Sequence, residues 1–127
     1  MIFGIGVDII EISRIKKSIE KFGDKFLNKI YTEKELDYCE TKKNKFQHYA
    51  ARFAAKEAIY KAMSTGWKKG ATWKNIEIYN EPNGMPKVRL FGELNDFVNP
   101  DKELQISMSH SDNYVAVVAI LYTKNGN

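Results

Sequence analysis

The chain has 127 residues, a length that suits one domain with a small core, so we expect residues 1–127 to form a single domain. Its 20 Lys and Arg outnumber its 16 Asp and Glu, and the net charge of +4 favours anionic partners without reaching the charge density of nucleic-acid binders. A single cysteine, no apolar stretch near the ~20 residues of a membrane span and no signal-peptide pattern at the start indicate a cytoplasmic protein with no disulfide, membrane or nucleic-acid partner.

Residues 2–12 are rich in β-branched side chains, which favours a buried strand. Gly4 and Gly6 interrupt it, and glycines in a strand allow another backbone or a ligand to come close. Asp8 is unusual here, because an unpaired carboxylate in a half-buried strand is costly. It needs a cation, a metal ion or backbone donors, and the sequence leaves these alternatives open.

Ser13 fits the N-cap of a helix whose apolar residues recur at helical spacing, and Gly23 fits its end. The apolar positions are Ile12, Ile15, Ile19 and Phe22. The opposite face is basic and continues past the glycine: it comprises Arg14, Lys17, Lys21, Lys25 and Lys29. This stripe is equally compatible with a solvated face and with a docking surface for an acidic partner.

Thr32 and Glu35 have the spacing of a capping box, which predicts a short scaffold helix as far as Glu40. A basic loop at 42–45 leads into a long helix over 47–63 that ends near Gly66. Residues 70–73 read as a further connection.

The long helix has one face of alanines, which allows a neighbouring element to approach closely. Arg52, Lys56, Glu57 and Lys61 are predicted on the other side. Glu57 and Lys61 could be an ordinary i,i+4 pair on a solvated surface, worth about 0.2–0.5 kcal/mol. Arg52 and Lys56 are like charges at the same spacing, so this side of the helix suits a phosphate or a carboxylate.

The second half of the chain has the period of strands. Residues 76–79 and 87–90 form a predicted hairpin with its turn at 80–84, and a short helix at 91–98 ends before Pro100. Two more strands, 104–110 and 114–121, flank a turn at 111–113. The predicted fold class is therefore α+β, with a small antiparallel sheet, joined by residues 2–12, packed on the long central helix.

Two features of the last strands bear on function. His110 lies at a strand end beside a turn, where it is either a turn residue or a group that binds phosphate or exchanges protons. Residues 115–121 are apolar at every position, so both faces of that strand need cover. A second copy of the chain would supply it, which predicts an oligomer.

Three segments together resemble the holo-acyl-carrier-protein synthases, the short bacterial-type 4′-phosphopantetheinyl transferases. They are 4–12 (GIGVDIIEI), 52–58 (RFAAKEA) with Lys61, and 107–111 (SMSHS). The resemblance covers essentially the whole chain, with the motifs in family order and at the usual spacing.

The resemblance implies transfer of 4′-phosphopantetheine from coenzyme A to a serine of an acyl carrier protein, with Mg²⁺, in support of fatty acid biosynthesis. Adenosine 3′,5′-bisphosphate is the other product. By matching position, Asp8 and Glu57 are the implied metal ligands, and Glu57 or a water held by the metal is the implied base. Lys61 and His110 are implied to stabilise phosphate oxygens, Arg52 to contact a coenzyme A phosphate, and Asn83 and Pro86 to lie near the adenine.

The resemblance also implies a homotrimer with its sites in clefts between subunits, and a carrier protein docked on the first helix. The docking residues would be Arg14, Lys17, Lys21 and Lys25. Several positions that are often arginine in the family are lysine here, and lysine cannot make a bidentate contact with a carboxylate. The choice of carrier therefore stays open, and a relative that serves peptide or polyketide carriers is an alternative.

A different class of function is a non-catalytic module that holds an acidic protein or single-stranded nucleic acid on its basic stripe. That reading gives no use to Asp8 or Glu57, and it does not predict stabilisation by coenzyme A and magnesium.

Overall fold

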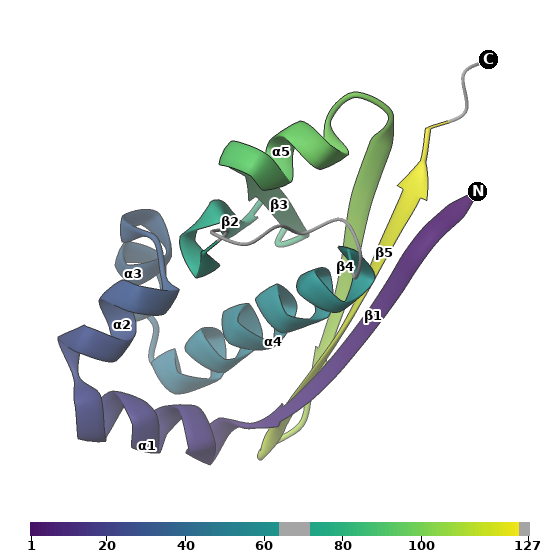
Figure 1. Ribbon diagram of the computed structural model, residues 1–127. Helices are drawn as coiled ribbons and strands as arrows, with labels where there is room; N and C mark the ends of the chain where they lie inside the picture. The colour runs from purple at the N-terminus through teal and green to yellow at the C-terminus, as the bar shows by residue number, and fades with distance from the viewer. Residues whose placement is uncertain (64–71, 125–127) are drawn as a thin grey trace.

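The long helix α4 (Lys45–Met63) lies across a three-stranded antiparallel sheet, and every other element is arranged around this pair (Figure 1). The computed structural model describes residues 1–63 and 72–124. The sheet has the order β1 (Ile2–Glu11), β5 (Tyr114–Thr123), β4 (Lys102–His110), so the first strand pairs with the last. This confirms the α+β fold class and the return of the N-terminal strand to the C-terminal sheet.

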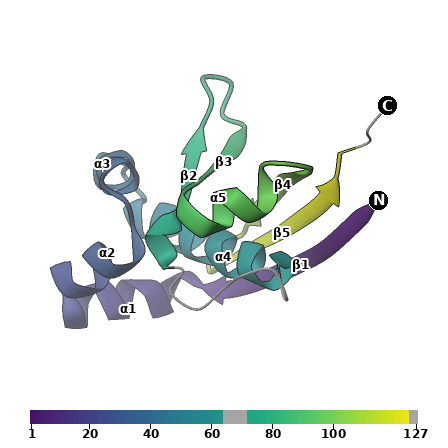
Figure 2. The ribbon, with the colours of Figure 1, turned by 45° about the horizontal axis from the view of Figure 1, so that its top comes forward.

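The remaining elements flank α4. Helices α1 (Ile12–Phe22), α2 (Asp24–Ile30) and α3 (Glu33–Glu40) gather toward one end of it (Figure 1). A separate hairpin of β2 (Ile76–Asn80) and β3 (Pro86–Leu90) follows the short 3₁₀ helix Trp73–Asn75 and projects away from the sheet (Figure 2). Helix α5 (Gly92–Val98) connects the hairpin to β4. The strands thus form two sheets.

Two glycines bring β1 directly onto the backbone of α4. A Cβ atom at Gly6 would lie 1.9 Å from the carbonyl oxygen of Ala58, and one at Gly4 would lie 1.9 Å from that of Ala62. No side chain fits in either space, so the strand and the helix approach to backbone contact. The predicted role of these glycines in close approach is confirmed.

The sheet has one covered face and one open face. Val115, Val117, Ala119 and Leu121 of β5 point toward α4 and are buried. On the opposite face, Ile5, Val7 and Ile9 of β1 are 58%, 61% and 66% exposed, and they pair with Ile120, Val118 and Ala116 of β5. The β4 residues on this face, Gln105 and Ser107, are polar and exposed.

A buried ion pair joins α3 to α4. Lys56 is 0% exposed, and its Nζ lies 2.6 Å from Glu35 Oε1 while also donating to the carbonyl oxygens of Ile30 and Trp73. Glu35 Oε2 accepts the backbone N–H of Ile78 in β2. The prediction that Lys56 lies on the open side of the long helix is wrong. Lys56 is buried, and the buried carboxylate of Glu35 pairs with it.

The first helices differ from the prediction in three ways. Helix α1 begins at Ile12 with Glu11 as its N-cap residue and no side-chain cap, so the proposed Ser13 cap is wrong; Ser13 Oγ instead lies 3.4 Å from Glu11 Oε2. Gly23 does end the helix, with φ of 57°. Phe22, placed on the apolar face by its spacing, is 53% exposed. Helix α2 was not predicted as a separate element.

Other predictions are confirmed. Thr32 and Glu35 form the capping box that opens α3, and the hairpin, α5 and the last two strands occupy the expected segments. The predicted end of the long helix near Gly66 and the start of the connection at 70–73 lie outside the described residues. Within the described residues, no helix has both the length and the apolar character needed to cross a bilayer.

Candidate functional site

Three of the predicted site residues meet beside the contact between β1 and α4. Asp8 comes from β1, and Glu57 and Lys61 come from α4; we call these residues the acidic group. Lys61 Nζ lies 3.1 Å from Asp8 Oδ1 and donates to the carbonyl oxygen of Val7 at 3.0 Å. Lys61 therefore supplies Asp8 with a cation, one of the partners that its place in a strand called for.

The carboxyl group of Glu57 has a raised pKa. Partial burial raises the pKa of its carboxyl group, and the negative charge of Asp8 raises it further, while Lys61 acts in the opposite direction. The carboxylates are therefore close enough to repel one another. A second positive charge at this point would relieve both the repulsion and the cost of burial.

The acidic group suits a hard divalent cation. It offers carboxylate oxygens, and Mg²⁺ commonly takes one or two carboxylates with water and substrate phosphate as its other ligands. Among the described residues, no cluster of three or more His, Cys, Asp and Glu side chains could hold a metal ion alone. The donor set therefore fits Mg²⁺ only if part of its coordination comes from a phosphate or water.

Arg52 lies on a different side of α4, toward the β2–β3 hairpin. It is 2% exposed, so its predicted place on the open face is wrong. Its Nη2 donates to Asn80 Oδ1 at 2.8 Å, and its guanidinium lies 4.3 Å from the centre of the Tyr38 ring. Among the described residues no carboxylate pairs with it, and its buried Nε has no hydrogen-bond partner. Within the described part of the chain, the Arg52 charge is therefore held by Asn80 and the Tyr38 ring and not by an anion.

His110 ends β4 and lies near His48 of α4, a residue that sequence reasoning missed. Burial lowers the pKa of His48, and the positive charges of Arg52, Lys42 and His110 lower it further. The His48 ring also packs edge-on against Tyr38, with 5.5 Å between ring centroids. The only signal in the sequence was its position four residues before Arg52, on the same side of the helix.

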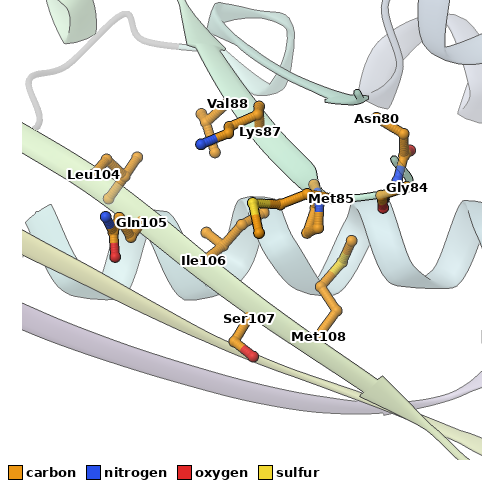
Figure 3. A pocket seen from close by; sticks show the side chains of 11 residues that line it. Asn80, Gly84, Met85, Lys87, Val88, Leu104, Gln105, Ile106, Ser107 and Met108 are labelled. Atoms are coloured by element: carbon orange, nitrogen blue, oxygen red, sulfur yellow. Dashed lines mark hydrogen bonds between the residues drawn. The ribbon is translucent and has the colours of Figure 1, made fainter. Parts of the chain in front are cut away.

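A cavity of about 540 Å³ lies between the hairpin tip and β4, a volume typical of small-molecule sites. Figure 3 shows Asn80, Gly84 and Met85 of the hairpin segment across from Leu104, Ile106 and Met108 of β4. The remaining lining residues are Pro86, Lys87, Val88, Gln105 and Ser107. Pro86 thus lines the cavity as a residue of the predicted nucleotide loop, whereas Asn83 does not line it and accepts the N–H of Met85 at 2.9 Å.

The predicted site residues fall at two opposite edges of the main sheet. The acidic group lies at the β1 edge, while His110 and the cavity lie at the β4 edge, with β5 between them. Arg52 belongs to the second set through Asn80. One chain therefore brings together Asp8, Glu57 and Lys61, but it does not bring His110 into contact with them.

The basic stripe on the first helices is exposed as predicted. Arg14, Lys17 and Lys21 of α1 and Lys25 of α2 are all exposed, and Lys21 Nζ lies 5.3 Å from the centre of the exposed Phe22 ring. These exposed cations form a positively charged surface on the first two helices.

Comparison with known proteins gives a consistent result. Residues 4–119 match the family model of the 4′-phosphopantetheinyl transferase superfamily. The chain is 42% identical over 123 residues to a holo-[acyl-carrier-protein] synthase of Koribacter versatilis, covering 95% of this chain and 98% of that protein.

Solved structures agree. The fold is similar to that of holo-[acyl-carrier-protein] synthase from Neisseria meningitidis, with a TM-score of 0.88 and 31% identity over 97% of this chain and 100% of that one. It is also similar to the Helicobacter pylori holo-[acyl-carrier-protein] synthase in complex with coenzyme A, with a TM-score of 0.79 and 32% identity over 93% and 99% of the two chains.

Proposed function

The chain belongs to the 4′-phosphopantetheinyl transferase superfamily, and from that premise we propose that it is the enzyme that converts apo-acyl carrier protein to its holo form. It transfers 4′-phosphopantetheine from coenzyme A to a carrier serine, releases adenosine 3′,5′-bisphosphate and so supports fatty acid biosynthesis. The observation that carries the assignment is the acidic group, two carboxylates and a lysine fixed at a strand–helix contact, in a chain that matches the family from 4 to 119.

The proposed chemistry is an in-line displacement at phosphorus. The serine hydroxyl oxygen bonds to the phosphorus that carries pantetheine, the pyrophosphate bond to that phosphorus breaks, and adenosine 3′,5′-bisphosphate leaves with the bonding electrons. Glu57 takes the serine proton. Asp8 and Glu57 would hold Mg²⁺, which when bound supplies charge neutralisation at the pyrophosphate. Lys61, already placed at Asp8, adds a fixed positive charge beside the same phosphates.

The β4 edge supplies the nucleotide half of the proposed site. Among the residues that the structure describes, Arg52 has no carboxylate partner, which supports its role as a contact for a coenzyme A phosphate. His110 would stabilise phosphate oxygens of coenzyme A next to the Arg52 contact. The cavity lined by Pro86 suits the adenine, with Asn83 shaping the turn that leads to it.

We further propose that the working unit is a homotrimer. The open sheet face of Ile5, Val7 and Ile9 is an apolar strip that a second copy would cover. Cyclic packing would also place the β1 edge of one subunit beside the β4 edge of the next. Each cleft would then unite an acidic group with a nucleotide half from another chain.

Carrier docking and location complete the proposal. The stripe of Arg14, Lys17, Lys21 and Lys25 would receive the acidic helix of the acyl carrier protein. The free, buried thiol of Cys39 suits a reducing compartment, and we place the enzyme in the cytoplasm.

The activity is tested by mass spectrometry of apo-acyl carrier protein incubated with the protein, coenzyme A and Mg²⁺. The expected result is a carrier heavier by one phosphopantetheine group, formed only when all components are present. A carrier of unchanged mass under these conditions, with a known synthase active in parallel, would reject the assignment.

Subunit sharing is tested by complementation. Glu57→Gln inactivates the acidic half and His110→Ala weakens the nucleotide half, so each variant alone should transfer poorly. When both are unfolded and refolded together, mixed oligomers should contain some clefts with two intact halves, and activity should return. If each chain held a complete site, mixing would restore nothing.

A further inference from the structure

We propose that Asn80 is a positioning residue that transmits the fixed position of Arg52 to the tip of the β2–β3 hairpin. This rests on the proposed function, because the tip forms one wall of the cavity assigned to the nucleotide. Asn80 would act through the tip rather than on the reacting atoms, and its contribution would appear in the binding of coenzyme A.

The Asn80 side chain accepts one hydrogen bond and donates another. Arg52 Nη2 donates to Asn80 Oδ1 at 2.8 Å, and Asn80 Nδ2 donates to the carbonyl oxygen of Gly84 at 3.1 Å. A guanidinium can only donate and a carbonyl can only accept, so these partners fix the orientation of the amide. Only a side chain with both an acceptor and a donor makes this connection.

Arg52 is a firm anchor for the connection. Its side chain is buried, stacks on Tyr38 and belongs to the central helix. A buried, stacked guanidinium has little freedom to move, and it presents its donors in a rigid planar fork. The Oδ1 atom of Asn80 is therefore held relative to α4.

The hairpin tip needs this support because the ladder ends at Asn80. Its strand partner is Pro86, and these two residues form the last pair of the ladder. Beyond that pair the turn has two backbone hydrogen bonds, Gly84 N to Glu81 O at 2.7 Å and Glu81 N to Met85 O at 2.9 Å. Both lie within the turn, so neither attaches it to the helix.

Gly84, Met85 and Pro86 line the cavity together with Asn80 itself. A shift of the tip would therefore move one wall relative to β4. The inference is that the chain Arg52–Asn80–Gly84 sets the width of the cavity before any ligand arrives, which lowers the ordering cost of binding.

Asn80→Asp separates the two hydrogen bonds. The carboxylate still accepts from Arg52, and gains a charge partner for it, but it cannot donate to Gly84. Amide hydrogen exchange of the free protein should become about tenfold faster at Gly84 and Met85, the effect of losing one such hydrogen bond. Because the new carboxylate also neutralises Arg52, the proposed phosphate contact, this variant tests the hydrogen bond to Gly84 by exchange and not by KM.

Asn99→Asp is the matched control, since it makes the same change of charge at an exposed residue after α5. It should leave both measurements as in the wild type. Asn80→Ala removes both hydrogen bonds without adding a charge, so it tests the effect on binding: the KM for coenzyme A should rise about tenfold while kcat stays within about twofold. Thermal melting should show that both variants stay folded.

The outcomes separate the two proposals. Unchanged exchange at the tip in Asn80→Asp would overturn the connection even if transfer is normal. Faster exchange in Asn80→Asp with an unchanged KM in Asn80→Ala would overturn the positioning role. If exchange is faster in Asn80→Asp as expected, but the wild-type protein neither binds nor uses coenzyme A, the connection would stand and the proposed function would be rejected.

Discussion

Lys61 forms its salt bridge with Asp8, a residue 53 positions away, at 3.1 Å between Nζ and Oδ1. The spacing in the sequence had suggested a pair with Glu57, one helical turn before it. The lysine instead crosses from the helix to the strand, and it only modulates Glu57, whose pKa it lowers against the larger effects of burial and Asp8. In this arrangement Glu57 is the acid that an added cation would stabilise.

Glu57→Gln should abolish transfer and yet stabilise the free protein. The folded-state pKa of Glu57 is above its ordinary value of 4.5, so its contribution to stability is greatest below that value and declines as pH rises through the folded pKa. A neutral glutamine removes this cost at pH 7. Thermal melting should show a higher Tm for Glu57→Gln without metal, and Mg²⁺ with coenzyme A should stabilise the wild type only.

Asp8→Ala and Glu57→Ala should each abolish transfer and leave the protein folded, because each removes one proposed metal ligand. Circular dichroism checks folding, and the carrier mass assay checks transfer. Near-normal activity of either variant in saturating Mg²⁺ would contradict the metal assignment.

Reversing the basic stripe should affect the carrier alone. Arg14, Lys17 and Lys21 replaced by Glu should raise the carrier KM at least about tenfold, since charges at a rim govern encounter and register. The affinity for coenzyme A, measured by calorimetry, should not change. An equal loss of coenzyme A affinity would instead assign the stripe to the nucleotide site.

Lys56→Met should destabilise the protein by about 3–5 kcal/mol, because it leaves Glu35 charged and buried without its partner. Burial lowers the pKa of Lys56, and the nearby Glu35 carboxylate opposes this shift. The buried charge of Lys56 is therefore stabilised by its partner. The double variant Lys56→Met with Glu35→Gln should recover part of the loss in urea unfolding. A single variant that loses less than about 1 kcal/mol would show that the buried charge is solvated in another way.

Val118→Asp should give monomers or aggregates without transfer activity. Val118 is chosen because it lies on the open sheet face, paired with Val7, whereas its neighbour Val117 is buried against α4. In the proposed trimer this face is covered by another subunit, so a charge there would be buried at high cost. Analytical ultracentrifugation measures the state, with Asn99→Asp as control; a fully active wild-type monomer at assay concentration would refute the shared site.

The elements could be predicted where a local pattern decides them. The structure confirms the capping box at Thr32 and the helix end at Gly23, as well as the strand pattern of the second half of the chain. Each of these depends on residues that are close in sequence. Phe22 and α2 were not predicted correctly, because the apolar spacing of α1 does not show where the packing partner ends. The cap at Ser13 failed because β1 continues directly into α1.

Site residues were predictable only in part. Asp8 stood out because an acid in an apolar strand has few explanations. The burial of Arg52 and Lys56 was hidden because their partners, Asn80 and Glu35, are 28 and 21 residues away. The separation of the acidic group from His110 depends on the strand order β1-β5-β4, which no local pattern encodes.

The backbone contact of Gly4 and Gly6 with α4 also determines how this site tolerates evolutionary drift. At Gly4 and Gly6 the strand lies against the main-chain carbonyl groups of Ala62 and Ala58, with no room for a side chain between them. Changes elsewhere in the core would alter stability before they altered the spacing of the acids. The two proposed metal ligands would therefore keep their spacing when other parts of the core are substituted.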